Sequence, residues 1–293
     1  MIKLLLMRLV RPIVGRFPGA FYFVASFIGW FAFRTRRGLR RKAVRNMLPL
    51  CDGDLARAKR EALRATQRVA QYYVDLATMP ERNTETFEAE HLSIEHPERL
   101  ALLAQPGPVV VVSAHTGNAE LAILALTWRG RDFVALVEAL KPRQLSNYLV
   151  NLRSSAGGTF HEAGFNGLRA SLAALKQGHL LGLMGDRDIQ GSGLCLQLAG
   201  RWVKLPRGPW EIARRSGAPA LPIFCSRTRN DSFTVYVEEP ISVARTDDAD
   251  ADVQVAAEQF ARVLEKHLRR EPGQWFVLED FWQVHACKEH GDG

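Results

Sequence analysis

The spacing of hydrophobic and polar positions changes near Pro106, and the two parts of the chain predict different elements. Before that point the clearest pattern is a helix over Asp54–Met79, where apolar residues recur at three- and four-residue steps. The opposite face of this helix carries lysine and arginine side chains. Asp52 or Asp54 is suited to cap its start, and Pro80 ends it.

Beyond Pro106, short apolar runs alternate with helical stretches. The predicted strands are Val109–Ser113, Phe133–Val137, Thr159–Glu162, Leu180–Met184, Leu194–Leu198, Ala220–Cys225 and Phe233–Val237. The predicted helices are Asn118–Trp128, Arg143–Ser155, Gly167–Gln177, Gly208–Ser216 and Asp252–Arg270. This alternation is typical of an α/β fold with a mainly parallel central sheet flanked by helices, and the continuous apolar runs indicate strands buried on both faces. We expect this α/β domain to span residues 51–293.

Residues 1–50 have a different character. Phe17–Phe33 is an uncharged run of 17 residues that follows a basic stretch, and seven basic residues with no acidic one follow over Arg34–Arg45. The run is short for a bilayer span, which usually takes about 20 residues, and a signal peptide would end in small residues instead. We expect residues 1–50 to associate with the cytoplasmic face of the membrane, lying in the interface or forming one short anchor. The alternative is a core helix beside a solvated charged segment.

The net charge indicates which classes of partner the protein could bind, and the cysteine spacing indicates the state of its thiols. The 293-residue chain has 39 basic and 31 acidic side chains and a net charge of +8, which favours an anionic membrane surface, nucleic acid or an acidic ligand. No nucleic-acid partner is expected, because no nucleic-acid-binding motif is present. Four cysteines lie far apart without a CxxC pair and predict free thiols of a reducing compartment. They are Cys51, Cys195, Cys225 and Cys287.

Two predicted strands end in polar clusters. Val109–Ser113 runs into "AHTGNAE", and Leu180–Met184 runs into "GDRDIQGSG". Because ligands gather at the carboxyl ends of parallel strands, both loops are expected to share one cleft. The cleft would then hold one imidazole, three carboxylates and a guanidinium. These are His115, Glu120, Asp186, Asp188 and Arg187.

The first loop predicts a general base. Gly117 permits a tight turn, and Asn118 is suited to cap the following helix. Glu120, in the first turn of that helix, is placed to fold back toward His115, where a carboxylate would fix the tautomer and stabilise the imidazolium. The alternative is that His115 is merely a satisfied polar residue and that Glu120 is an acid favoured by the helix dipole.

The motifs that are missing also restrict the chemistry. The sequence has no GxSxG elbow, no GxxxxGK[ST] phosphate loop, no GxGxxG after a strand and no HExxH. We therefore expect neither a resident cofactor nor a metal. A base without an obvious enzyme nucleophile predicts direct activation of a substrate hydroxyl, with no covalent enzyme intermediate.

Five stretches in chain order resemble one known group of enzymes. They are "RRGLRRKAVRNMLPL", "HTGNAE", "GDRDIQGSG", "LPRGPWEIARRSGAPALPIF" and "LEKHLRREPGQWFVLEDFW". Together they are similar to the bacterial lipid A late acyltransferases and the related phosphatidylinositol mannoside acyltransferases, whose H-x4-[D/E] motif aligns with His115 and Glu120. One departure is Ala119, where this family commonly has tryptophan.

The resemblance implies roles for individual residues. His115 would be the catalytic base, assisted by Glu120 as in the lipid A branch or by Asp186 as in the mannoside branch. Arg153 would support the site. Arg187 would bind a substrate phosphate or form an ion pair with one of its neighbours, Asp186 or Asp188. Backbone N–H groups at Gly117 and Asn118 would contact substrate and hold the oxyanion.

The implied reaction moves a fatty acyl chain from acyl-CoA or acyl carrier protein to a hydroxyl of a glycolipid or lipid. The acceptor stays open among lipid A precursors, phosphatidylinositol mannosides and other glycolipids or lysolipids. The apolar segment Phe17–Phe33 and the apolar face of Leu121–Trp128 are candidates to accommodate the acyl chain. Two other functions remain open at this point: an acyl thioesterase that uses the same base on water, and a non-catalytic membrane-binding module.

Overall fold

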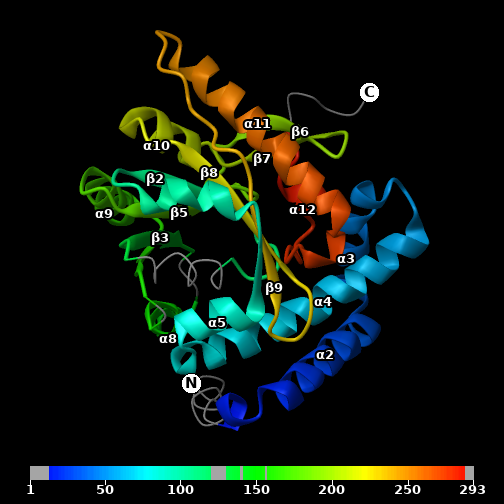
Figure 1. The fold of residues 1–293 in the computed structure, drawn as a ribbon. Helices are drawn as coiled ribbons and strands as arrows, with labels where there is room; N and C mark the ends of the chain where they lie inside the picture. Colours follow the sequence, from blue (N-terminus) through cyan, green and yellow to red (C-terminus); the bar gives the residue numbers. More distant parts are fainter. Residues whose placement is uncertain (1–12, 120–129, 139–140, 156, 288–293) are drawn as a thin grey trace.

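The computed structural model describes residues 13–119, 130–138, 141–155 and 157–287, and Figure 1 shows its course. A seven-stranded sheet has the order β1-β9-β8-β2-β5-β3-β4. The five strands from β8 to β4 run parallel, whereas β9 is antiparallel to β8 and parallel to β1. The strands are β1 (Leu92–Glu95), β2 (Val109–Ser113), β3 (Phe133–Val137), β4 (Thr159–Glu162), β5 (Leu180–Met184), β8 (Ala220–Arg227) and β9 (Phe233–Val237). The predicted α/β fold is confirmed.

Helices cover both faces of the sheet. In the view of Figure 1, α10 and α11 lie above it, and α4, α5 and α8 lie below. The helices are α2 (Pro18–Thr35), α3 (Arg37–Met47), α4 (Leu55–Thr78), α5 (Thr84–His91), α6 (Ala101–Ala104), α8 (Arg143–Ser154), α9 (Phe165–Lys176), α10 (Gly208–Ser216), α11 (Ala249–Arg270) and α12 (Phe281–Val284). Asp54 caps α4 by accepting hydrogen bonds from two N–H groups of its first turn, as predicted.

Alternate residues of β2 serve the two faces. Val110 and Val112 belong to the hydrophobic cluster that contains α9, α10 and α11. Val109 and Val111 belong to the cluster that contains α5, α6 and α8. Because successive side chains of a strand point to opposite faces, a strand buried on both sides is apolar throughout, which explains the "VVVV" run.

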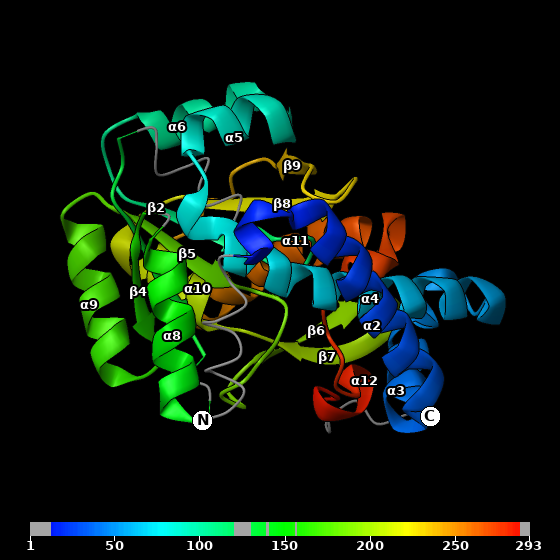
Figure 2. The same ribbon diagram turned by 90° about the horizontal axis from the view of Figure 1, so that it is seen from below.

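The N-terminal helices pack onto the rest of the fold. In both views α2 lies against α4 (Figures 1 and 2). At Gly29 a Cβ would lie 2.6 Å from the Cα of Gln67, so only glycine permits this close approach. On α3, the Asn46 side chain donates hydrogen bonds to the carbonyls of Val277 (2.9 Å) and Glu279 (2.7 Å). The division of the chain at residue 50 stays a prediction, and contacts of this kind cross it.

The outer side of α2 is apolar as well. Phe23 is 75% exposed, and Phe27 and Phe31 are each more than half exposed. Searching the described residues for a helix of the length and hydropathy needed to cross a membrane gives none. The alternative of a fully buried core helix is thus wrong for this segment, since one side of α2 packs on α4 and the other side is exposed.

The structure also corrects the sequence predictions for Leu194–Leu198 and for two of the cysteines. Leu194–Leu198 is a strand, but this strand, β6, forms a separate antiparallel hairpin with β7 (Arg201–Leu205) and does not join the main sheet. Cys195 on β6 and Cys287 form a disulfide, so these two thiols are not free. Spacing along the chain could not show this pairing, because the two cysteines are 92 positions apart and only the fold brings their Cα atoms to 5.9 Å.

Candidate active site

Strand register places the two central side chains of the site. β2 and β5 are parallel neighbours, with Ser113 opposite Met184. His115 and Asp186 each lie two residues beyond these partners, so both emerge at the carboxyl edge of the sheet. The Nδ1 atom of His115 lies 2.8 Å from Oδ1 of Asp186. The structure therefore brings together the two polar clusters that the sequence placed at strand ends.

Asp186 is fully buried and accepts several hydrogen bonds. Its Oδ2 atom accepts from the backbone N–H of His115 (3.1 Å) and from the indole Nε1–H of Trp275 (2.9 Å). Burial alone would raise the pKa of Asp186, but attraction to His115 and these hydrogen bonds outweigh it and lower the pKa below its ordinary value. Asp186 is therefore a carboxylate at neutral pH and acts only as an acceptor.

This carboxylate fixes the orientation of the imidazole. With Nδ1–H donated to Asp186, Nε2 is the ring nitrogen that can accept a proton. The His115 side chain is 31% exposed, whereas that of Asp186 is 0% exposed. The carbonyl of His115 accepts a hydrogen bond from the N–H of Phe276 (2.7 Å), which holds the loop from the other side. An oriented, partly exposed imidazole backed by a buried carboxylate can act as a general base.

Gly117 allows the loop to pass close to β8. Its φ is +57°, and a Cβ at this position would lie only 2.0 Å from the carbonyl oxygen of Cys225. Any other residue would force the loop away from β8. This would also displace His115, which precedes Gly117 by two residues. Gly117 thus serves the turn that the sequence predicted.

The expected oxyanion donors are already engaged. The backbone N–H groups of Thr116, Gly117 and Asn118 all have acceptors within the protein. These are the carbonyls of Ala114 (2.7 Å) and Gln274 (3.1 Å) and the sulfur of Cys225. The role of the N–H groups of this turn in holding an oxyanion stays a prediction, and each group would first have to give up its acceptor.

Cys225 is not a hidden nucleophile. Its side chain is fully buried beside the His115 loop, and burial raises the pKa of its thiol to about 12. Since the thiolate is the reactive form, this cysteine is inert at neutral pH. Its position agrees with a reaction in which the acceptor hydroxyl itself is the nucleophile.

A buried polar network supports the loop, and the sequence did not reveal it. Asp75 of α4 accepts hydrogen bonds from the side-chain amide of Asn118 (2.8 Å) and the hydroxyl of Tyr22 (2.5 Å) and forms an ion pair with Arg227. Both members of the ion pair are 0% exposed. The only sequence signal was an acid on the otherwise apolar face of a helix. Asn118 is thus a side-chain donor to Asp75, and no contact of it with substrate follows from the geometry.

Arg153 is connected to His115 only indirectly, through other side chains. It donates a hydrogen bond to the hydroxyl of Tyr72 (2.9 Å), and the Tyr72 ring packs edge-on against Phe276 at 5.8 Å between centroids. Because Phe276 also holds the carbonyl of His115, Arg153 is connected to the imidazole through two aromatic residues. This position agrees with a supporting role rather than direct contact with His115.

Arg187 has a partner that was not predicted. Its guanidinium makes two hydrogen bonds to Glu279, of 2.8 and 3.1 Å, whereas the sequence suggested Asp186 or Asp188. Burial would lower the pKa of Arg187, but the hydrogen bonds to Glu279 raise it above its usual value. Asp188 instead accepts from the N–H groups of Gly191 (3.0 Å) and Gly193 (2.7 Å). The guanidinium N–H groups of Arg187 that would bind a phosphate therefore already donate to the carboxylate of Glu279.

Glu120 and the apolar stretch Leu121–Trp128 lie outside the described residues. Within the described part of the chain, no group of three or more histidine, cysteine or acidic side chains is arranged to hold a metal ion.

Comparison with known proteins gives a consistent picture. A family model described as bacterial lipid A biosynthesis acyltransferase matches residues 6–284. The chain is 29% identical over 188 residues to a phosphatidylinositol mannoside acyltransferase of Mycobacterium tuberculosis, covering 62% of this chain and 56% of that protein. It is 27% identical over 187 residues to the protein of the same name from Mycolicibacterium smegmatis, covering 62% and 59%. The match spans just over half the length of these relatives.

Proposed function

The chain belongs to the bacterial lipid A biosynthesis acyltransferase family, and on this premise we propose that it is an O-acyltransferase acting at a membrane surface. It would move a fatty acyl chain from an acyl thioester to a hydroxyl of a glycolipid or lipid. The observation that carries the proposal is the pair of His115 and Asp186, with a 2.8 Å contact at the carboxyl edge of the sheet and an imidazole that is partly exposed.

The geometry suits a single transfer step. Nε2 of His115 accepts the proton of the acceptor hydroxyl while the oxygen attacks the thioester carbonyl. Asp186 stabilises the imidazolium that results, since it is held as a carboxylate by three donors. When the tetrahedral intermediate collapses, the carbon–sulfur bond breaks and the imidazolium returns the proton to the thiolate. No resident cofactor is needed for these steps.

The family and its named relatives support a lipid or glycolipid acceptor. The donor is acyl-CoA or acyl carrier protein, because an activated thioester supplies the acyl group without further energy. The acceptor is a glycolipid, of which phosphatidylinositol mannosides are the example given by the names of the mycobacterial relatives. Lipid A precursors are the alternative that the family description suggests.

Membrane association is supported by the exposed side of α2. A row of large apolar side chains faces outward there, including Phe23, Phe27 and Phe31. The arginines of α3 follow immediately in the chain and would contact anionic head groups. We propose that α2 lies in the membrane interface, at the cytoplasmic face, with the site beside it.

The test uses the purified chain, long-chain acyl-CoA and acyl carrier protein donors, and a bacterial lipid extract. Mass spectrometry then searches for lipids that gain one acyl chain. A product made by the wild type and absent with His115→Ala supports the proposal and identifies both acceptor and chain. Free fatty acid alone, lost in the same variant, would show a thioesterase. Equal products from both proteins would rule out the role of His115.

A further inference from the structure

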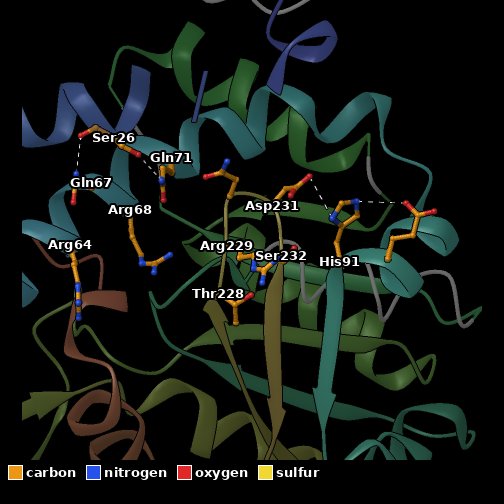
Figure 3. Close-up of a pocket in the computed structure, with 12 residues that line it drawn as sticks. Ser26, Arg64, Gln67, Arg68, Gln71, His91, Thr228, Arg229, Asp231 and Ser232 are labelled. Carbon is orange, nitrogen blue, oxygen red and sulfur yellow. Dashed lines mark hydrogen bonds and ion pairs between the residues drawn. The ribbon is translucent and has the colours of Figure 1, made fainter. Parts of the chain in front are cut away.

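A polar cavity of about 680 Å³ lies between α2, α4 and the loop that joins β8 to β9. Figure 3 shows its wall: Ser26 of α2 contacts Gln67 and Gln71 of α4, and Arg68 extends from α4 toward the loop over 228–232. None of these side chains belongs to the His115 site. The cavity therefore has no role in the chemistry derived so far.

Arg68 is the unusual residue of this cavity. It is half-buried, and among the described residues no hydrogen-bond acceptor or carboxylate lies within bonding distance of its guanidinium. Burial, with repulsion from Arg227 and Arg64, lowers the pKa of Arg68 to about 10, although Glu271 attracts it from beyond ion-pair distance. A partly desolvated cation without a partner is costly, because desolvation is not compensated by pairing.

The other charges of the cavity do not supply this partner. Asp231 and Glu90 lie on either side of His91, at 3.5 and 3.9 Å from its ring nitrogens. Arg64 forms an ion pair with Glu61. The charged residues that line the cavity in the described part of the chain thus leave Arg68 without a counter-charge.

The cavity lies near the transfer site. The Cys225 carbonyl adjoins Gly117 of the His115 loop, and Thr228 follows three residues further along the same chain direction. At about 3.3 Å per residue of extended chain, this is a step of roughly 10 Å. One substrate molecule can reach both places.

We propose that this cavity binds the phosphate ester group of a substrate, with Arg68 as its principal ligand. A guanidinium matches phosphate oxygens bidentately, and the amides of Gln67 and Gln71 are hydrogen-bond donors on the same wall. The two available sources are the phosphates of a CoA-type donor and the phosphodiester of the acceptor lipid. The assignment to a substrate rests on the acyl transfer proposed above, whereas phosphate binding itself does not.

Binding is therefore measured first, without turnover. The full-length chain is titrated calorimetrically with CoA, which carries the donor phosphates, and with glycerophosphoinositol, which carries the lipid phosphodiester. The variants are Arg68→Gln and Arg68→Lys. Arg60→Gln is the matched control, because Arg60 is an exposed arginine of the same helix and does not line the cavity.

Loss of Arg68 is expected to weaken one of the two probes about tenfold, and Arg68→Lys to weaken it less. Arg60→Gln should leave both unchanged. Weaker CoA binding assigns the cavity to the donor, and weaker glycerophosphoinositol binding assigns it to the acceptor. In turnover the KM of the same substrate rises while kcat is kept. Binding of neither probe, or equal binding by wild type and Arg68→Gln, overturns the proposal.

Stability gives a second readout. An arginine that binds substrate and pairs with none of the described residues should be dispensable for folding, so Arg68→Gln is expected to keep or raise Tm. Arg187→Gln is the contrast, since it leaves Glu279 without its guanidinium. A clear fall in Tm for Arg68→Gln with unchanged affinity would make Arg68 a structural residue. An inactive wild type that still binds phosphate through Arg68 would contradict the proposed function alone.

Discussion

Two histidines of this protein each contact a carboxylate, yet their surroundings differ. His115 and Asp186 lie at the carboxyl edge of β2 and β5, and the His115 side chain is 31% exposed. His267 of α11 contacts Glu238 at 2.6 Å, but its side chain is only 4% exposed. Its other ring nitrogen faces Arg270 at 2.9 Å, and Phe224 stacks on the ring at 4.2 Å between centroids.

The difference shows what a histidine–carboxylate pair means. A carboxylate partner fixes the orientation and the tautomer of an imidazole. A structural histidine in the core needs this as much as a catalytic histidine does. Burial lowers the pKa of His267 to about 4 despite the nearby acid, so it is neutral and structural. His115 instead has its carboxylate buried behind it and its ring partly exposed in front. Access to the ring is thus the feature that separates the two pairs.

The largest effect should come from neutralising Asp186. Asp186→Asn keeps the shape but no longer stabilises the imidazolium, and kcat is expected to fall roughly 10³-fold. Glu238→Gln makes the same change at the other pair and should leave kcat unchanged. Steady-state acyl transfer with both variants gives the comparison. A loss of less than tenfold for Asp186→Asn would remove the functional distinction between the two pairs.

The next largest effect is expected from the buried network around Asp75, which supports the His115 loop. Asp75→Asn leaves Arg227 buried without a counter-charge, and the expected loss of unfolding free energy is about 3–5 kcal/mol. Urea denaturation measures it. The control is Glu211→Gln, which breaks a partly exposed pair with Arg207 and should cost about 1 kcal/mol or less. Equal losses in both variants would show that the network around Asp75 does not carry the loop.

The buried His267 is expected to make the free energy of unfolding depend on pH. Its pKa is about 4 in the folded protein and about 6.5 when unfolded, so the unfolded chain binds more protons between these values. The stability due to neutral His267 is therefore complete above about pH 6.5 and is lost as pH falls toward 4, by up to about 3 kcal/mol. Unfolding of wild type and His267→Gln across this range should show a flatter slope in the variant. Parallel slopes would mean that His267 is charged in the folded state.

A smaller effect is expected from the indole that contacts Asp186. Trp275→Phe removes one of the three donors to this carboxylate, and kcat should fall about tenfold, which corresponds to about 1.4 kcal/mol. Trp282→Phe is the matched change, since its indole donates to the carbonyl of Asn46 instead. Measuring kcat of both variants at one pH shows whether the hydrogen bond to Asp186 is responsible for the loss. Equal losses would indicate a general effect of packing.

Much of the local structure could be predicted from the sequence. Five-residue strands such as Val109–Ser113 and Leu180–Met184 have the predicted bounds. His115 lies at a strand end, as the switch from apolar to polar residues indicated. These features depend on neighbours in the chain, and the periodicity of side chains reports them directly.

The remaining features depend on contacts between distant segments. The sequence alone determined which residues form strands and helices, that an imidazole and an acid follow two of the strands, and that the N-terminal helix is apolar. Only the tertiary structure decided that β2 lies beside β5, so that Asp186 meets His115. It also decided the disulfide between Cys195 and Cys287 and the cavity around Arg68. Strand order, side-chain pairing and unpaired charge arise from the packing of the whole chain, which no local pattern encodes.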